Sequence, residues 1–192
     1  GLHMCSADLR VGASHVAHPP VAVMALCAGK FAEYASSYCL QCTPGKYSSL
    51  PEAGSCTVCD GGKYSSSGAT SCEACDAGQY SSPMSSGCST CSAGTSSASG
   101  SPSCTPCDPG YESNSGASTC YECAGGKYSS ESNDACINCD AGKFSAPGSA
   151  SCASSCEAGT YAGLGATTCL ECLGGTFASS GAESCTNCPS GK

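Results

Sequence analysis

The chain has 192 residues, including 22 cysteines and 25 glycines, and a formal net charge of −8. Hydrophobic residues make up 40% of it, but that share counts the cysteines, and tryptophan is missing. Burying a large side chain stabilises a fold by about 1.5–3 kcal/mol, whereas ordering costs about 1–2 kcal/mol per residue. The composition therefore argues against helical bundles and α/β enzyme folds, and it predicts a fold held by disulfides or metal ions.

The charge balance argues against nucleic acid as a partner, because 15 acidic residues face only 7 lysines and arginines. No apolar run approaches the roughly 18–20 residues of a membrane span, so we expect none in this segment. Cysteine at this density is typical of oxidising compartments. We therefore expect a secreted or cell-surface protein.

The N-terminal segment, residues 1–26, differs from the rest because it is rich in valine and leucine and carries a lone cysteine, Cys5. A short repeat cannot bury so many aliphatic side chains. We expect this segment to cap the first repeat or to dock on the array of an adjacent chain as an added strand. Residues 27–38 begin with Cys27-Ala-Gly-Lys-Phe31, which we interpret as a degenerate partial repeat.

From residue 39 to residue 192 one unit recurs, with the pattern C-x2-C-x2-G-x-[YF]-S-S-x2-G-x3-C. Its step is sixteen residues, with two steps of seventeen, and the last copy is cut short. The first cysteines of the copies are Cys39, Cys56, Cys72, Cys88, Cys104, Cys120, Cys136, Cys152, Cys169 and Cys185. The second cysteines are Cys42, Cys59, Cys75, Cys91, Cys107, Cys123, Cys139, Cys156, Cys172 and Cys188. A fixed period predicts an elongated solenoid or rod whose repeats pack on their neighbours.

A glycine follows each second cysteine by three positions, which indicates a positive φ or a close backbone approach. These repeat glycines are Gly45, Gly62, Gly78, Gly94, Gly110, Gly126, Gly142, Gly159, Gly175 and Gly191. Each copy then reads as an extended segment, a turn, a second extended segment and a cysteine corner, without helical periodicity. The fold class predicted is small, disulfide-rich and mostly β or irregular.

An aromatic residue stands two positions after most repeat glycines, and Ser96 and Glu112 break this pattern. We expect these rings to stack as the small core of each repeat: Tyr47, Tyr64, Tyr80, Tyr128, Phe144, Tyr161 and Phe177. Paired serines often follow the aromatic. In a secreted protein they are candidate acceptors of O-linked glycans, namely Ser48, Ser49, Ser65, Ser66, Ser129 and Ser130. We expect no other cofactor.

The array resembles the cysteine-rich repeat of ephrin A/B receptors and, more distantly, the first half-module of tumour-necrosis-factor receptors. The segment that carries the resemblance best is Cys59-Asp-Gly-Gly-Lys-Tyr-Ser-Ser-Ser-Gly-Ala-Thr-Ser-Cys72. Repeats of this family are frequent in large extracellular proteins of algae and other protists, including proteins of flagellar hairs. The resemblance identifies a module and says little about activity.

The resemblance implies that the second cysteine of one copy pairs with the first of the next. The implied ladder is Cys27–Cys39, Cys42–Cys56, Cys59–Cys72, Cys75–Cys88, Cys91–Cys104, Cys107–Cys120, Cys123–Cys136, Cys139–Cys152, Cys156–Cys169 and Cys172–Cys185. A bridge over such a loop is worth about 3 kcal/mol, whereas ordering sixteen residues costs about 24 kcal/mol. The repeats must therefore also stack on one another.

The ladder leaves Cys5 and Cys188 without partners. In one interpretation they join successive chains head to tail. In another, two-bridge modules such as Cys39–Cys56 with Cys42–Cys59 close internally and Cys5 pairs with Cys27. We favour the ladder, because two-bridge modules predict a period of thirty-two residues. In a third, Cys188 pairs with residues beyond Lys192, since the sequence stops inside a copy.

The paired C-x2-C motifs are also close to the spacing of a zinc ribbon. We favour disulfides, because every pair repeats at once in an acidic sequence that is poor in lysine and arginine. The acidic residues are scattered along turns, and we expect no catalytic site, bound metal or enzyme activity.

The sequence thus favours a non-enzymatic extracellular structural protein that assembles with itself or with other fibre proteins into a filament, hair or sheath. The alternative is the stalk or ligand-binding ectodomain of a cell-surface receptor or adhesion protein. A filament protein associates with itself, and a stalk does not.

Overall fold

The computed structural model describes residues 28–32, 38–50, 53–130, 134–153 and 155–189. These residues form two-residue strands joined by turns, and they contain no helix. No helix of the described residues is therefore long and apolar enough to cross a membrane. The protein has a small, disulfide-rich, mostly β fold, as the sequence predicts. Cys5, Cys27, Gly191 and most of residues 1–38 lie outside the described ranges.

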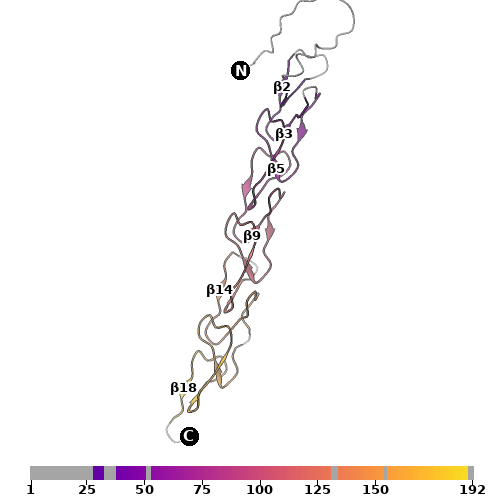
Figure 1. Ribbon diagram of the computed structural model, residues 1–192. Helices are drawn as coiled ribbons and strands as arrows, with labels where there is room; N and C mark the ends of the chain where they lie inside the picture. Colours follow the sequence, from indigo (N-terminus) through magenta and orange to yellow (C-terminus); the bar gives the residue numbers. More distant parts are fainter. Residues whose placement is uncertain (1–27, 33–37, 51–52, 131–133, 154, 190–192) are drawn as a thin grey trace, which may run out of the picture. The chain divides into compact units, whose positions relative to one another are not determined.

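The strands pair in chain order as antiparallel hairpins (Figure 1). The hairpins are β1 (Lys30–Phe31) with β2 (Leu40–Gln41), β3 (Lys46–Tyr47) with β4 (Thr57–Val58), β5 (Lys63–Tyr64) with β6 (Glu73–Ala74), β7 (Gln79–Tyr80) with β8 (Ser89–Thr90), β9 (Thr95–Ser96) with β10 (Thr105–Pro106), β11 (Tyr111–Glu112) with β12 (Tyr121–Glu122), β13 (Lys127–Tyr128) with β14 (Ile137–Asn138), β15 (Thr160–Tyr161) with β16 (Leu170–Glu171), and β17 (Thr176–Phe177) with β18 (Thr186–Asn187). The first strand of a hairpin follows a repeat glycine, and the second lies between the two cysteines of the next C-x2-C pair.

Each hairpin begins with a tight turn that needs its glycine. In Thr43-Pro44-Gly45-Lys46 the Lys46 N–H donates to the Thr43 carbonyl at 3.1 Å, and Gly45 has φ +81°. A proline at the second position and a positive φ at the third are the signature of a type II turn. All nine predicted repeat glycines within the described residues have positive φ: Gly45, Gly62, Gly78, Gly94, Gly110, Gly126, Gly142, Gly159 and Gly175.

A second turn with positive φ lies at the far end of seven disulfide loops, at what we call the tip position. It is occupied by Gly68, Met84, Gly100, Gly116, Gly148, Gly165 and Gly181. The tip N–H donates to the carbonyl of the second cysteine of the preceding repeat at 2.8–3.0 Å, as in Gly68 to Cys42. Successive hairpins are thereby bound to one another by backbone hydrogen bonds.

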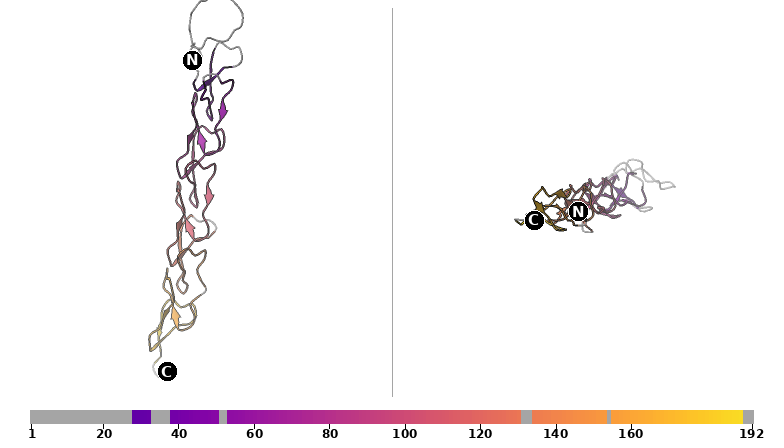
Figure 2. Two further views of the ribbon diagram at one scale, coloured as in Figure 1. Left: turned by 45° about the vertical axis from the view of Figure 1, so that its right-hand side comes forward. Right: turned by 90° about the horizontal axis from the view of Figure 1, so that it is seen from below.

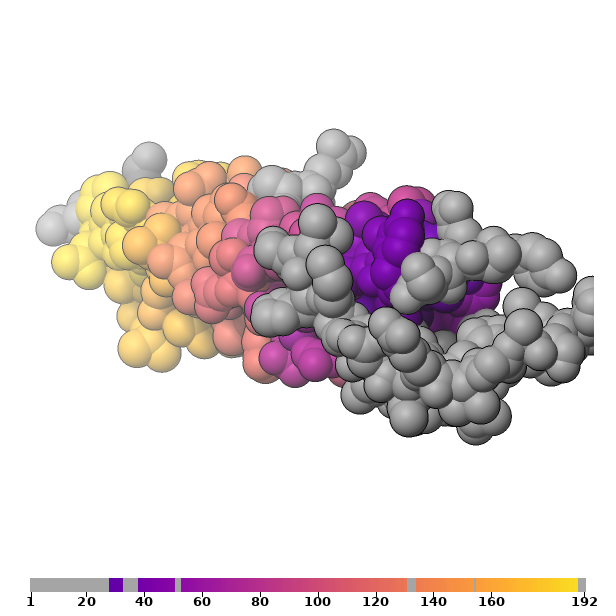
Figure 3. Space-filling view, turned by 90° about the horizontal axis from the view of Figure 1, so that it is seen from above, coloured from indigo at the N-terminus to yellow at the C-terminus, as the bar shows by residue number. Residues whose placement is uncertain are grey.

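The chain divides into two compact units. Unit 1 comprises Gly1–Ser89 with Ala98–Ser103, and unit 2 comprises Thr90–Ser97 with Cys104–Lys192. Within each unit the hairpins follow one another in the order of the sequence, which both side views show (Figures 1 and 2). In the space-filling view the coloured loops of each unit also lie in the order of the sequence (Figure 3).

The interior is made of cysteine and serine rather than of large apolar side chains. The buried cysteines are the second ones of the copies: Cys42, Cys59, Cys75, Cys91, Cys107, Cys123, Cys139 and Cys156. The residue after the repeat aromatic is also buried: Ser48, Ser65, Ser81, Ser97, Ser113, Ser129, Ser145, Ala162 and Ala178. The first cysteines are half-buried. Each repeat therefore buries one end of its disulfide and one small side chain.

The predicted aromatic core is wrong in its location. The six aromatics from Tyr47 to Tyr161 are only half-buried, and Phe177 is 49% exposed. Successive residues of an extended segment point to opposite sides, so the side chain that follows the ring is the one that faces inward. The rings are therefore half-exposed at the surface of their repeats and do not form its core.

Met84 is the only residue other than glycine with positive φ in the described part of the chain, at +64°. A side chain in this conformation costs about 1–2 kcal/mol, and glycine gives back about 0.5–1 kcal/mol through its greater freedom when unfolded. We expect Met84→Gly to raise the free energy of unfolding by about 0.5–1 kcal/mol. Denaturant unfolding of the oxidised chain measures this. Met84→Ala is the control, since it shortens the exposed side chain but keeps the strain; equal stability of the two variants would contradict the account.

Candidate functional site

The candidate functional site is the contact between repeats, which recurs along the array. Its first component is the disulfide loop. Nine bridges each join a second cysteine to the first cysteine of the next copy, 13 or 14 residues further along. They are the pairs of the ladder from Cys42–Cys56 to Cys172–Cys185.

The remaining cysteines are accounted for as follows. Cys39 is disulfide-bonded, and Cys27, its partner in the ladder, lies outside the described residues. Cys188 is free and exposed, and Cys5 lies outside the described residues. The alternative of two-bridge modules is wrong for the described repeats, because Cys56 pairs with Cys42 and not with Cys39. A cysteine in a disulfide has no thiolate to give to zinc, so the zinc-ribbon alternative loses its ligands there.

The second component is the repeat glycine, which contacts three neighbouring segments at once. Its N–H donates to the carbonyl of the buried serine or alanine of the next repeat at 2.7–3.1 Å, as in Gly62 to Ser81. Its carbonyl accepts from the N–H of the second cysteine that closes its own hairpin, as in Cys75 to Gly62 at 2.9 Å. Its α-carbon lies against the repeat after next. A Cβ on Gly62 would stand 1.9 Å from the Gly100 carbonyl oxygen.

This last contact recurs in both units and has a spacing of two repeats. A Cβ on Gly45 would meet the Met84 carbonyl at 2.0 Å, and one on Gly126 or Gly142 would meet the carbonyl of Gly165 or Gly181 at 2.0–2.2 Å. Consecutive tips make the same contact, as Gly68, Met84 and Gly100 do with Gly29, Gly45 and Gly62. Each repeat glycine in these contacts therefore meets the tip of the repeat after next.

The third component is the buried serine. The Ser65, Ser81, Ser113, Ser129 and Ser145 hydroxyls each donate to a carbonyl of the preceding repeat at 2.7–3.0 Å. A hydroxyl in an interior requires such a partner. Ser129 also accepts from the Gly110 N–H at 2.9 Å. These bonds add a side-chain link between the backbones of adjacent repeats.

The burial of these serines corrects part of the glycan prediction. Ser48, Ser65 and Ser129 are at most 3% exposed, so an O-linked sugar has no room there. Their neighbours Ser49, Ser66 and Ser130 are exposed and remain candidate acceptors. The sequence pairs the two serines, but only the alternation of an extended segment separates their environments.

The groups at this site hold neighbouring repeats together. Among the described residues no group of three histidine, cysteine or acidic side chains is arranged to hold a metal ion. What the arrangement provides is a covalent bridge in each loop, glycine contacts two repeats apart and hydrogen bonds between adjacent repeats.

Comparison with known proteins leaves the family open. No protein-family model matches the chain, and no curated protein matches it significantly.

Gly126 and Gly159 separate the two roles of the repeat glycine. Both have positive φ, +82° and +85°, but a Cβ on Gly126 would stand 2.0 Å from the Gly165 carbonyl, whereas a Cβ on Gly159 meets nothing within 4 Å. We expect Gly159→Ala to cost about 1–2 kcal/mol for conformation alone, and Gly126→Ala to cost more than about 3 kcal/mol because backbone must move. Denaturant unfolding of the oxidised variants compares them. Equal losses would contradict the stacking of repeats two apart.

Tyr64 offers a pH test of the hairpin of β5 and β6. Its hydroxyl donates to Glu73 Oε2 at 2.8 Å. This hydrogen bond and the negative charge of Glu73 raise the pKa of Tyr64 above its usual 10.0. The stabilisation is therefore fully present below the ordinary pKa and is lost as the pH rises through the raised value. We expect Glu73→Gln to lower the pKa of Tyr64, measured by NMR of its ring, and Glu183→Gln to leave it unchanged. A pKa that is the same in all three proteins would contradict the hydrogen bond.

Proposed function

We propose that the chain is a non-enzymatic structural protein of the extracellular space, a subunit of a filament, flagellar hair, sheath or cell-surface fibre. The nine disulfides support an oxidising environment for the folded chain. The resemblance to ephrin-receptor-like repeats favours the extracellular side and the fibre. The two arguments are independent, since the first rests on bridges and the second on sequence.

The observation that carries the proposal is that adjacent repeats are joined by the same hydrogen bonds along the array. Each repeat directs its tip N–H and the carbonyl of its buried serine or alanine to the preceding repeat, and its glycine N–H and the carbonyl of its second cysteine to the following one. A contact of this kind is heterologous, because its two faces differ, and it extends a chain of repeats without closing it. Such an interface suits a protein that grows in one direction.

The ladder also suits a load-bearing role. Pulling on a repeat loads a loop closed by a covalent bond, so the segment inside that loop cannot extend until the disulfide is reduced. The small interior contributes little by burial, which makes the bridges and backbone hydrogen bonds the main restraints. The exposed serines Ser49, Ser66 and Ser130 would carry glycans on the outside of the fibre.

Self-association is the property that tests this proposal. We propose that chains join head to tail, with the exposed thiol of Cys188 forming a disulfide with Cys5 of the next chain. Native protein with blocked thiols should then run as a series of multimers that collapses to one species on reduction. The Cys188→Ser variant should lose the covalent series but still form filaments by electron microscopy, because the stacking contact does not need that bridge.

The second candidate function, a stalk or ligand-binding ectodomain, rests on the breaks in the repeat at Ser96 and Glu112, where the aromatic is missing. A chain that stays monomeric in light scattering and in electron micrographs, with and without reductant, would contradict the filament and favour this candidate.

A further inference from the structure

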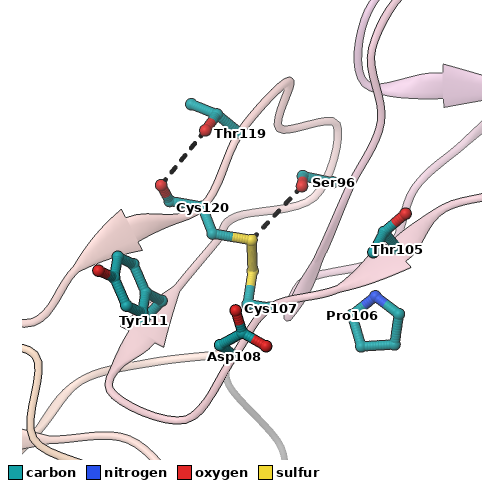
Figure 4. A pocket seen from close by; sticks show the side chains of 8 residues that line it. All are labelled: Ser96, Thr105, Pro106, Cys107, Asp108, Tyr111, Thr119 and Cys120. Carbon is teal, nitrogen blue, oxygen red and sulfur yellow. Dashed lines mark hydrogen bonds between the residues drawn. A yellow bond between two sulfur atoms is a disulfide. The ribbon is translucent and has the colours of Figure 1, made fainter.

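An open hollow lies in unit 2 at the position where the repeat loses its aromatic residue (Figure 4). It has a volume of about 270 Å³ and is lined by Ser96, Thr105, Pro106, Cys107, Asp108, Tyr111, Thr119 and Cys120. The floor is the Cys107–Cys120 disulfide. Ser96 lies at hydrogen-bond distance from it, with 3.4 Å between its Oγ and Cys120 Sγ.

A second hollow of about 210 Å³ occupies the equivalent place further along unit 2 and holds a different set of side chains. It is lined by Tyr128, Asp140, Lys143, Ser151 and Cys152, which stand at the positions of Ser96, Asp108, Tyr111, Thr119 and Cys120. The chain thus brings a phenol ring, a carboxylate and an ammonium group of its own to this second hollow. The Ser96 hollow keeps the carboxylate and has neither that ring nor that cation.

The same neighbourhood of ring and carboxylate is present in unit 1. Asp76, at the position of Asp108, is close enough to Tyr64 to contribute to raising the pKa of its hydroxyl. The aromatic position of one repeat therefore faces the acidic position of the next. At Ser96 this arrangement leaves Asp108 beside an open space.

The stretch of sequence around Asp108 carries only negatively charged side chains. Residues 64–126 contain Glu73, Asp76, Asp108, Glu112 and Glu122 but no lysine, arginine or histidine. No cationic side chain lines the Ser96 hollow. A ligand that brings a positive charge is attracted to this region, and an anion is repelled.

Tyr111 decides which cation fits best. It takes the place that Lys143 has in the second hollow, and its side chain is 36% exposed. Its ring lies on one side of the bridge and Asp108 beside it (Figure 4). A guanidinium group stacks on an aromatic face and also pairs with a carboxylate through two parallel N–H groups, whereas an ammonium group is a compact, strongly hydrated point charge.

We propose that the Ser96 hollow is a binding site for an arginine side chain of a partner protein. The guanidinium stacks on Tyr111 and donates to the Asp108 carboxylate, and the methylene stem lies over the Cys107–Cys120 bridge. At the rim, the hydroxyls of Thr105 and Thr119 donate hydrogen bonds to backbone carbonyls of the partner or accept them from its backbone N–H groups. The site goes beyond the cohesive contacts between repeats, because those contacts do not use these side chains.

The test is an NMR titration of the oxidised full-length chain with N-acetyl-arginine amide. We expect saturable shifts at Asp108, Tyr111 and Thr119. The citrulline analogue, which has the same shape without the charge, should bind at least about fivefold more weakly, as should arginine with Asp108→Asn. Equal responses to arginine and citrulline, or shifts spread evenly over all acidic residues, would overturn the proposal.

A second set of variants uses residues that other copies of the repeat hold at the same positions, so that loss of binding is not caused by misfolding. Ser96→Tyr restores the common residue and should weaken the response to arginine by narrowing the hollow, as Tyr128 does in the second one. Tyr111→Lys should abolish the shifts by supplying the cation internally. Conversely, the double variant Tyr128→Ser with Lys143→Tyr should create a second arginine site beside Asp140. Binding that is unchanged in Tyr111→Lys, or a double variant whose disulfides form normally but that gains no site, would count against the assignment.

Discussion

The structure depends on one disulfide in each sixteen-residue repeat, which closes a loop between cysteines 13 or 14 residues apart. A loop of this size holds too few apolar side chains to bury a core, and its interior consists of a cysteine and one serine or alanine. The bridge does not order the chain by itself, because its worth of about 3 kcal/mol is far below the cost of fixing the loop. It brings the repeat glycine and the tip of each loop to positions where the backbones of neighbouring repeats meet.

The contact two repeats apart explains why glycine recurs where it does. A type II turn alone accepts a few other residues at some cost, as Met84 shows at the tip position. The repeat glycine has a second constraint, because a carbonyl of the repeat after next takes the place that a Cβ would need. No other residue satisfies both the positive φ and the missing space for a Cβ at the repeat glycine. At the tip position held by Met84 only the φ is restricted, and methionine is tolerated there because its side chain is exposed.

Much of this could be predicted from the spacing of the cysteines and glycines. The fold class, the positive φ of the repeat glycines and the ladder implied by the family resemblance agree with the structure. The position of the core could not be read from composition, because Tyr128 and Ser129 are adjacent and only the direction of each side chain decides which is buried. The contact between repeats two apart was also hidden, since the signature of a copy does not say which later copy its glycine touches.

The central claim is that each disulfide joins the second cysteine of one copy to the first cysteine of the next and so closes one short loop. Disulfide mapping by mass spectrometry tests it most directly, on protein taken from its native oxidising environment with free thiols blocked before digestion. The account predicts bridges between cysteines 13 or 14 residues apart, from Cys42–Cys56 to Cys172–Cys185. Bridges such as Cys39–Cys56 with Cys42–Cys59, or blocked thiols throughout the array, would contradict it.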